Sequence, residues 1–179
     1  MTRAPVSWWA LLVTCIGLLG ASTATAQVND AALKAAYIYN FAMFSTWPDA
    51  VPKSPLYVCA NPGGPLWASL QGINGKSVNG RNWTTAGLAD QKTTRCDVIV
   101  LSPFDERPAP PKGAKPGVPA LSVLVVRDGA GRNGAGRNTA AVTLVDDDEH
   151  IRFDVDTEEA VRDGIHFSSR LLRLARNVK

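Results

Sequence analysis

Three glycines within the segment DGAGRNGAGRN have the G-x-G-x-x-G spacing of a dinucleotide-binding turn: Gly129, Gly131 and Gly134. Such a turn needs a strand before it and a helix after it, because the phosphates lie against the N-terminus of that helix. The apolar run before the glycines predicts the strand, but TAAVTLV at 139–145 predicts a second strand where the helix should begin. The pentapeptide GAGRN is also repeated in tandem. We therefore interpret the segment as a hairpin loop lengthened by a duplication.

Other residues capable of catalysis or metal binding are few. The histidines are His150, beside the acidic run at 146–149, and His166, between two apolar residues. The acidic run lacks the glycine and the spacing of a calcium loop, which indicates a solvated hairpin turn. No serine nucleophile elbow, zinc-binding helix or phosphate-binding loop is present in the sequence. The sequence therefore nominates no catalytic residue, no metal site and no cofactor.

The N-terminal segment has the pattern of a secretory signal peptide. An uncharged apolar run occupies residues 8–20, and Ala24-Thr25-Ala26 has the small-x-small pattern of a cleavage site. We expect residues 1–26 to be the signal peptide and residues 27–179 to be one exported domain. The net charge of +3 is too small to indicate nucleic-acid binding by bulk charge.

Two cysteines follow the expected cleavage site, Cys59 and Cys96. In an oxidising compartment an even number of cysteines suggests a disulfide. Such a bond would close a loop of roughly 38 residues, worth about 4 kcal/mol in the chain-entropy model. Two free buried thiols are the alternative interpretation.

Strand and helix patterns alternate along the chain. Helices are predicted at 30–48, 66–73, 157–163 and 170–179, and strands at 55–60, 76–88, 96–102, 120–128 and 165–168, with a hairpin at 139–156. The strand at 76–88 is predicted to turn at Asn79-Gly80. The helix at 157–163 has Asp156 as its N-cap and Gly164 at its end. Alternating elements predict an α/β fold, and the hairpin makes the sheet mixed. We expect a single domain with a central mixed β-sheet flanked by helices.

The first predicted helix is apolar on more than one side. Spacing places Leu33, Tyr37, Phe41 and Phe44 on one face, but apolar residues also occupy the opposite face. Such a helix is either buried on most sides or covered by a partner. We therefore expect Tyr37, Phe41, Phe44 and Trp47 to contribute to a surface that contacts a partner protein or a second copy in a homodimer, with a purely structural core role as the alternative.

Two long stretches at the ends of the chain carry a family resemblance. They are LKAAYIYNFAMFSTWP at 33–48 and IRFDVDTEEAVRDGIHFSSRLLRLA at 151–175. The first is similar to the opening helix, and the second to the closing segment, of the YfiR family of periplasmic proteins. The strands that carry Cys59 and Cys96 also resemble two cysteine-bearing strands of the family. The chain departs from the family pattern at Asp156, which replaces an asparagine, and at Asp97, which replaces a histidine.

The resemblance implies a non-enzymatic regulator. YfiR-like proteins bind the periplasmic domain of an inner-membrane diguanylate cyclase and hold it inactive, which lowers cyclic di-GMP and disfavours biofilm. The resemblance therefore implies a location in the periplasm. A periplasmic small-ligand binding protein is the alternative, with His166 and Arg170 as candidate contacts to the small molecule. The alternative roles of these two residues are a half-exposed structural histidine and a solvated arginine near the end of a helix.

Overall fold

The structure is a computed structural model that describes residues 23–48, 55–89, 95–103, 105–108, 122–129, 140–147 and 150–179. Residues Ala31–Lys179 form one compact unit, and the segment up to Asp30 forms another. Most of the expected signal peptide and most of the duplicated GAGRN segment lie outside the described residues.

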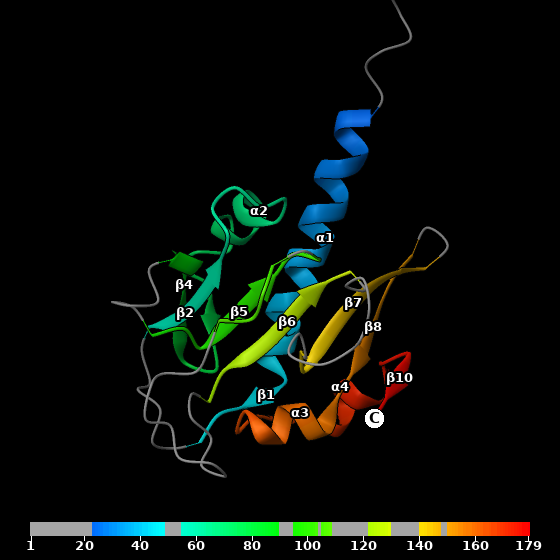
Figure 1. The fold of residues 1–179 in the computed structure, drawn as a ribbon. Coiled ribbons are helices and arrows are strands. Elements are labelled where there is room, and N and C mark those ends of the chain that lie inside the picture. The colour runs from blue at the N-terminus through cyan, green and yellow to red at the C-terminus, as the bar shows by residue number, and fades with distance from the viewer. Residues whose placement is uncertain are drawn as a thin grey trace, which may run out of the picture. The chain divides into compact units, whose positions relative to one another are not determined.

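A mixed β-sheet is the centre of the unit Ala31–Lys179, as predicted (Figure 1). Among the described residues its strand order is β10-β8-β7-β6-β5-β2-β4-β3. The strands are β2 (Leu56–Ala60), β3 (Ser77–Val78), β4 (Arg81–Gly87), β5 (Val98–Leu101), β6 (Leu124–Asp128), β7 (Val142–Asp147), β8 (His150–Val155) and β10 (Asn177–Val178). Strands β4, β2, β5, β6 and β7 are parallel to one another, whereas β3 and β8 run antiparallel to their neighbours β4 and β7. The predicted α/β class is therefore confirmed.

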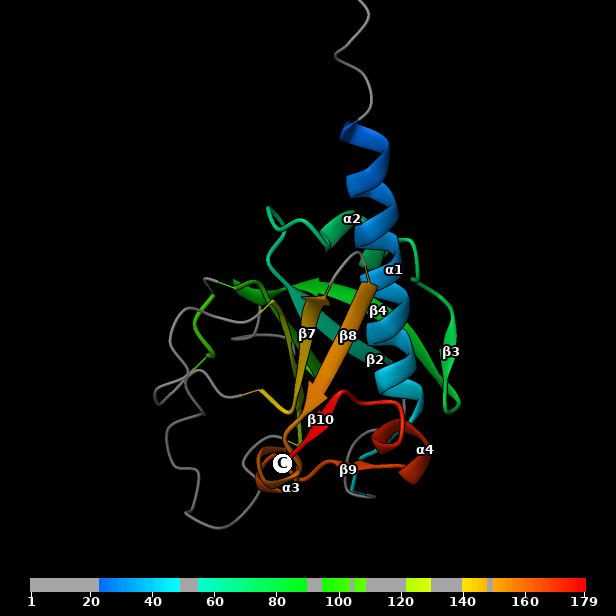
Figure 2. The same ribbon diagram turned by 90° about the vertical axis from the view of Figure 1, so that its right-hand side faces the viewer.

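Four helices and a second, two-stranded sheet complete the described fold (Figure 2). The helices are α1 (Thr23–Met43), α2 (Trp67–Gln71), α3 (Thr157–Arg162) and α4 (Ser169–Leu172). The small sheet pairs β1 (Ser45–Thr46) with β9 (His166–Phe167). Helix α1 begins at Thr23 and not at the predicted residue 30, because no helix-breaking residue separates the two positions.

The two faces of the parallel strands bury different clusters. On β2, Val58 packs in the cluster that contains the buried residues of α1, whereas Cys59 packs in a smaller cluster. On β6, Val126 and Val125 are divided between the clusters in the same way. Alternate side chains of a strand point to opposite faces, so both faces of these apolar strands are buried.

Helix α1 buries one stripe of its apolar surface against the sheet. Ala35, Ile38, Phe41 and Ala42 are buried, whereas Leu33 is 48% exposed. The buried stripe is therefore rotated away from Leu33. A helix that is apolar on several sides does not reveal from its sequence which side faces the sheet.

Local turn and capping signals are confirmed. Asn79 and Gly80 both have positive φ, 50° and 79°, and they join β3 to β4 as a hairpin. The Asp156 side chain accepts a hydrogen bond from the Glu159 amide, 2.9 Å away, and so caps α3. Gly164 follows α3 with a φ of 72°, a conformation that favours glycine.

Two predictions about longer segments are wrong. Strands β6 and β7 are parallel, with Val126 opposite Val142, so the duplicated segment between them belongs to a crossover and not to a hairpin. The last predicted helix ends at Leu172, and the chain continues into β10. The amide of Lys179 donates to the Val155 carbonyl, so pairing with the edge strand β8 replaces further helix.

Candidate functional site

The two segments that carry the family resemblance meet at the end of α1. Ser45 pairs with Phe167 and Thr46 pairs with His166 in the β1–β9 sheet. The amide of Ser168 then donates to the carbonyl of Phe44, 2.9 Å away. Residues more than a hundred positions apart in the sequence therefore form one backbone-bonded structure.

Strand alternation divides this small sheet into an inner and an outer side. The buried Ser45 hydroxyl donates to the Phe41 carbonyl, 2.6 Å away, so Ser45 lies on the inner side. Its neighbour Thr46 and the cross-strand partner His166 are exposed on the outer side. We call the surface around this sheet the terminal platform; its members are Phe44, Thr46, Trp47, His166, Phe167 and Arg170. His166 and Arg170 are exposed, whereas the aromatic members other than His166 are half-buried.

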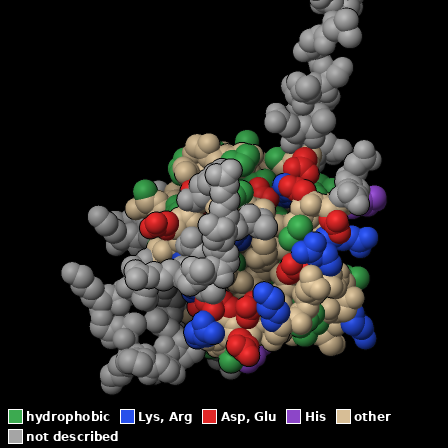
Figure 3. All heavy atoms as spheres, turned by 45° about the vertical axis from the view of Figure 1, so that its right-hand side comes forward, with side chains coloured by type: hydrophobic (Ala, Val, Ile, Leu, Met, Phe, Trp, Pro, Cys, Tyr) green, Lys and Arg blue, Asp and Glu red, His purple; other side chains and the backbone are tan. Residues whose placement is uncertain are grey.

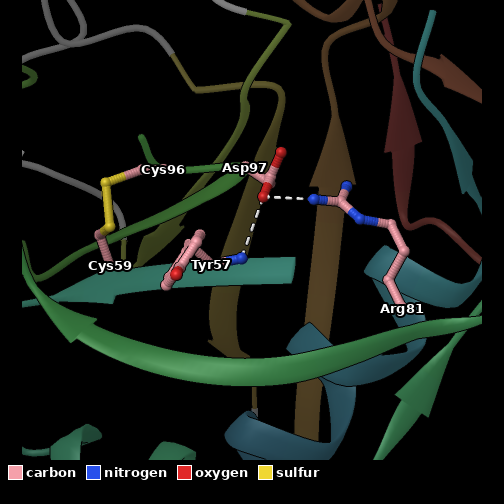
Figure 4. The surroundings of a disulfide bond; sticks show 5 residues. All are labelled: Tyr57, Cys59, Arg81, Cys96 and Asp97. Carbon is pink, nitrogen blue, oxygen red and sulfur yellow. Dashed lines mark hydrogen bonds and ion pairs between the residues drawn. A yellow bond between two sulfur atoms is a disulfide. The ribbon is translucent and has the colours of Figure 1, made fainter. Parts of the chain in front are cut away.

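Trp47 connects the terminal platform to the main sheet. Its indole Nε1 donates to the Asp97 carbonyl at 3.3 Å. The Asp97 carboxylate is buried and accepts from the Arg81 guanidinium at 2.6 Å and from the Tyr57 amide at 2.9 Å (Figure 4). Arg81 also donates to the Pro55 carbonyl at 2.7 Å. The Asp97 carboxylate therefore holds the start of β5 against Tyr57 on β2 and Arg81 on β4 through charge-assisted hydrogen bonds.

The residue that precedes Asp97 is in the disulfide. Cys59 and Cys96 are bonded, with their Cα atoms 5.7 Å apart (Figure 4). The bond joins β2 to the residue two positions before β5 and is buried in the smaller cluster. Trp47 is therefore anchored to a segment that is itself fixed by a covalent bond.

Comparison with protein families identifies the family of this chain. The YfiR/HmsC-like family matches residues 31–176. The chain belongs to the YfiR/HmsC-like family. This is a regulatory, non-catalytic family of periplasmic proteins, and the match includes the terminal platform and the disulfide.

Two further comparisons are less informative. A solved structure, a conserved domain protein from Vibrio cholerae O1 biovar eltor strain N16961, is similar with a TM-score of 0.43 and 15% sequence identity. The similarity covers 83% of this chain and 60% of that one, so the YfiR/HmsC-like chain corresponds to about three fifths of the other protein. No curated protein matches the chain.

The structure separates the four predicted partner-binding residues of this YfiR/HmsC-like chain into two groups. Phe44 and Trp47 flank β1, which pairs with the strand of the predicted ligand contact His166, and the other predicted contact, Arg170, lies on α4, directly after that strand. Phe41 is only 1% exposed and its ring centroid lies 4.9 Å from that of Phe153, so it is a core residue and not a partner contact. The alternative of a core role is therefore correct for Phe41.

Tyr37 belongs with Phe41 and not with the terminal platform. Its ring centroid lies 6.1 Å from that of Phe41 and 6.1 Å from that of Phe153. Its hydroxyl donates to the Ile151 carbonyl at 3.2 Å. Tyr37 therefore fixes α1 to β8, and only Phe44 and Trp47 of the four remain as candidate partner contacts.

Sequence reasoning missed the buried charges. Lys34 is 7% exposed, and its ammonium lies 3.2 Å from an Asp128 carboxylate oxygen and 3.0 Å from one of Asp146. These ion pairs tie α1 to β6 and β7. A lysine four residues before Ile38, within the buried stripe, was the available signal.

Charged side chains also fix the C-terminal segment. Arg107 binds the carboxylates of Glu159 and Asp163. Burial raises the pKa of Asp163, while the hydrogen bond and charge of Arg107 act in the opposite direction. Acidic and basic side chains are interspersed on the face in Figure 3. This pattern is typical of local ion pairing.

The part of the chain that the structure describes holds neither a cluster of metal ligands nor a membrane-spanning helix. Within it, no group of three or more histidine, cysteine or acidic residues could hold a metal ion. In the same residues, no helix has the length and apolarity needed to cross a membrane.

Proposed function

We infer that this chain is exported to the periplasm and represses an inner-membrane diguanylate cyclase by binding the periplasmic domain of that enzyme. Lower cyclase activity would reduce cyclic di-GMP and biofilm formation. The terminal platform is the surface that contacts the cyclase, with Phe44 and Trp47 as apolar anchors and Arg170 as an exposed cation beside them.

The observation that carries this proposal is the combination of family membership with the position of the family-like segments. The family match spans residues 31–176, and its two ends come together as β1 and β9. Structural stability alone does not require an exposed histidine and arginine in segments that also carry half-buried aromatic rings. Aromatic and arginine side chains are the types that most often dominate binding energy at protein interfaces.

The export signal is part of the same proposal. Cleavage after Ala26 would leave a chain that begins within α1, since this helix starts at Thr23. The mature protein would keep the residues of α1 that pack on the core among the described side chains, from Ala31 onward. N-terminal sequencing of the exported protein would identify the first residue, and we expect Gln27.

The proposal is tested in cells that produce an inner-membrane diguanylate cyclase with a periplasmic domain. We would express the chain with its N-terminal segment in these cells and measure cyclic di-GMP. The wild type should lower the nucleotide level, and Trp47→Ala should restore it. Trp67→Ala is the matched control, because Trp67 is also half-buried against the core but lies on α2. Protein levels in the periplasm would be compared by immunoblot.

The charge of the terminal platform is tested separately. Arg170→Glu reverses an exposed charge at the platform, and Arg152→Glu reverses an exposed charge on β8. We expect only the first to weaken repression. Equal repression by both variants and by Trp47→Ala would mean that the cyclase does not bind at the terminal platform.

A further inference from the structure

Arg127 is a buried cation that the proposed function does not use. It lies on β6, opposite Leu101 of β5, and is 3% exposed. One terminal nitrogen, Nη1, donates to the carbonyls of Ser102 and Asp105, each 3.1 Å away. The guanidinium is therefore held in place by the loop that follows β5.

The other edge of this guanidinium has no hydrogen-bond partner in the part of the chain that the structure describes. Nε and Nη2 of Arg127 are both buried, and neither has a hydrogen-bond partner among the described residues. These two nitrogens point their N–H groups in the same direction, and this pair binds the two oxygens of a carboxylate or phosphate. Burying N–H donors without an acceptor costs free energy of folding. The two donors Nε and Nη2 of Arg127, unsatisfied among the described residues, therefore indicate a binding role.

Nearby charges do not complete the site. The Asp105 carboxylate is engaged by the Ser102 amide at 2.9 Å and acts on Arg127 through charge alone. Burial lowers the pKa of Arg127, and the charge of Asp105 opposes this effect. The effect of burial is the larger of the two, so a further negative charge bound beside Arg127 would stabilise its charged form.

Arg127 lies one strand away from the place in the sheet where small molecules bind in other α/β proteins. The parallel strands have the order β4-β2-β5-β6-β7. After β2 the chain adds β4 on one side of it, and then adds β5, β6 and β7 on the other side, so the strand order reverses between β2 and β5. Ligands of open parallel sheets bind outside the carboxyl ends of the strands at such a reversal. Arg127 lies near the carboxyl end of β6, next to β5.

Close packing of the loops supports a formed site at this edge. A Cβ atom at Gly64, after β2, would lie 3.6 Å from the Ser102 hydroxyl and 3.0 Å from the Asn61 carbonyl. A Cβ atom at Gly129, after β6, would lie 3.1 Å from Pro103. The loops after β2, β5 and β6 therefore contact one another around the segment that holds Arg127.

We propose that Arg127 binds the carboxylate or phosphate group of a small anionic molecule through Nε and Nη2, at the carboxyl edge of β5 and β6. This anionic molecule would be a second ligand of the protein, bound at a site separate from the terminal platform. The proposal is independent of cyclase binding, because none of its residues belongs to the platform.

Nitrogen-15 NMR of the purified chain tests this site directly. We would titrate inorganic phosphate, and separately acetate, at constant ionic strength with chloride and follow the Nε–H resonance of Arg127. We expect a saturable shift with at least one anion and a parallel rise in melting temperature. Saturation by phosphate alone identifies a phosphate site, and saturation by acetate alone identifies a carboxylate site.

Two variants show whether the arginine fork is required. Arg127→Lys keeps the charge but lacks the paired N–H groups, and we expect anion affinity to fall at least tenfold. Arg152→Lys, on the exposed side of β8, is the matched control and should bind like the wild type. The proposal is wrong if neither anion shifts the Arg127 resonance, or if Arg127→Lys binds as tightly as the wild type. If Arg127→Lys does not fold, the wild-type titration alone decides.

Discussion

The indole of Trp47 donates a hydrogen bond to the carbonyl of Asp97, which lies 50 positions later in the chain. The Asp97 carboxylate binds Arg81, and the preceding residue, Cys96, is bonded to Cys59. The terminal platform is thus connected through one dipeptide to a buried ion pair and to the disulfide. Because this support is rigid, the exposed side chains of the platform are presented in a fixed arrangement.

Replacing Trp47 with phenylalanine removes this hydrogen bond but keeps an aromatic ring. The Asp97 carbonyl retains the amide of Leu124 as a donor at 2.9 Å, so it is not left unpaired. We therefore expect a loss of about 0.5–1 kcal/mol in the free energy of unfolding, measured in urea. Trp67→Phe is the control for loss of the larger ring. A loss no greater than that of the control would show that the hydrogen bond does not stabilise the fold.

Removing the disulfide should destabilise the fold far more. The double variant Cys59→Ala, Cys96→Ala releases a loop with a sequence separation of 37. We expect a loss of about 4 kcal/mol in the free energy of unfolding, largely because the unfolded chain gains freedom. Mass spectrometry of non-reduced peptides should show the linked pair in exported protein. Two freely alkylated thiols in that protein would contradict the bond.

Lys34 tests the buried ion pairs between α1 and the sheet. Lys34→Met keeps the apolar stem and removes the charge beside Asp128, whose side chain is 9% exposed. Leaving a buried carboxylate without this cation should cost about 3 kcal/mol of stability, measured by urea unfolding. Lys76→Met, at an exposed position, is the control and should change stability by less than about 0.5 kcal/mol. Equal stability of the two variants would show that the ion pairs are dispensable.

The pairing of Asp154 with Arg176 predicts a pH effect on stability. Two guanidinium nitrogens of Arg176 lie 2.9 and 2.7 Å from the Asp154 oxygens, and this hydrogen bonding lowers the pKa of Asp154. An aspartate in an unfolded chain has a pKa of about 3.9. The lowered pKa therefore contributes stability above about pH 4, which is lost as the pH falls through the folded-state value.

The measurement is the melting temperature of the wild type and of Asp154→Asn between neutral and acidic pH. We expect the wild type to melt higher at pH 7 and the difference to shrink as the pH falls below about 4. Glu158→Gln, which removes an exposed carboxylate from α3, is the comparison variant. A difference that stays constant or grows on acidification would contradict the assignment.

Local signals predicted the parts of the fold that depend on local chemistry. Asn79-Gly80 supports a turn that needs two positive φ angles, and Asp156 supports the capping of α3. The cysteine count also predicted the pair Cys59–Cys96, because only two cysteines follow the expected cleavage site. In each case few residues decide the outcome.

Non-local pairing could not be predicted in the same way. Whether β7 lies parallel or antiparallel to β6 depends on the path of the chain between them, and the β-branched pattern is the same in both cases. The C-terminal residues have a helical pattern but pair with β8, since an open sheet edge offers main-chain partners to β10. The buried cations Lys34, Arg81 and Arg127 depend on acidic or carbonyl partners that only the tertiary structure brings near.

The central claim is repression of a diguanylate cyclase through the terminal platform, and the rate of cyclic di-GMP synthesis tests it most directly. The full-length membrane cyclase would be placed in lipid nanodiscs with GTP, and the purified chain would be added to the periplasmic side. We predict a saturable fall in rate with the wild type and with Trp67→Ala, and a response at least tenfold weaker with Trp47→Ala. An unchanged rate with saturating wild type would contradict repression, and equal inhibition by both tryptophan variants would contradict the terminal platform as the binding surface.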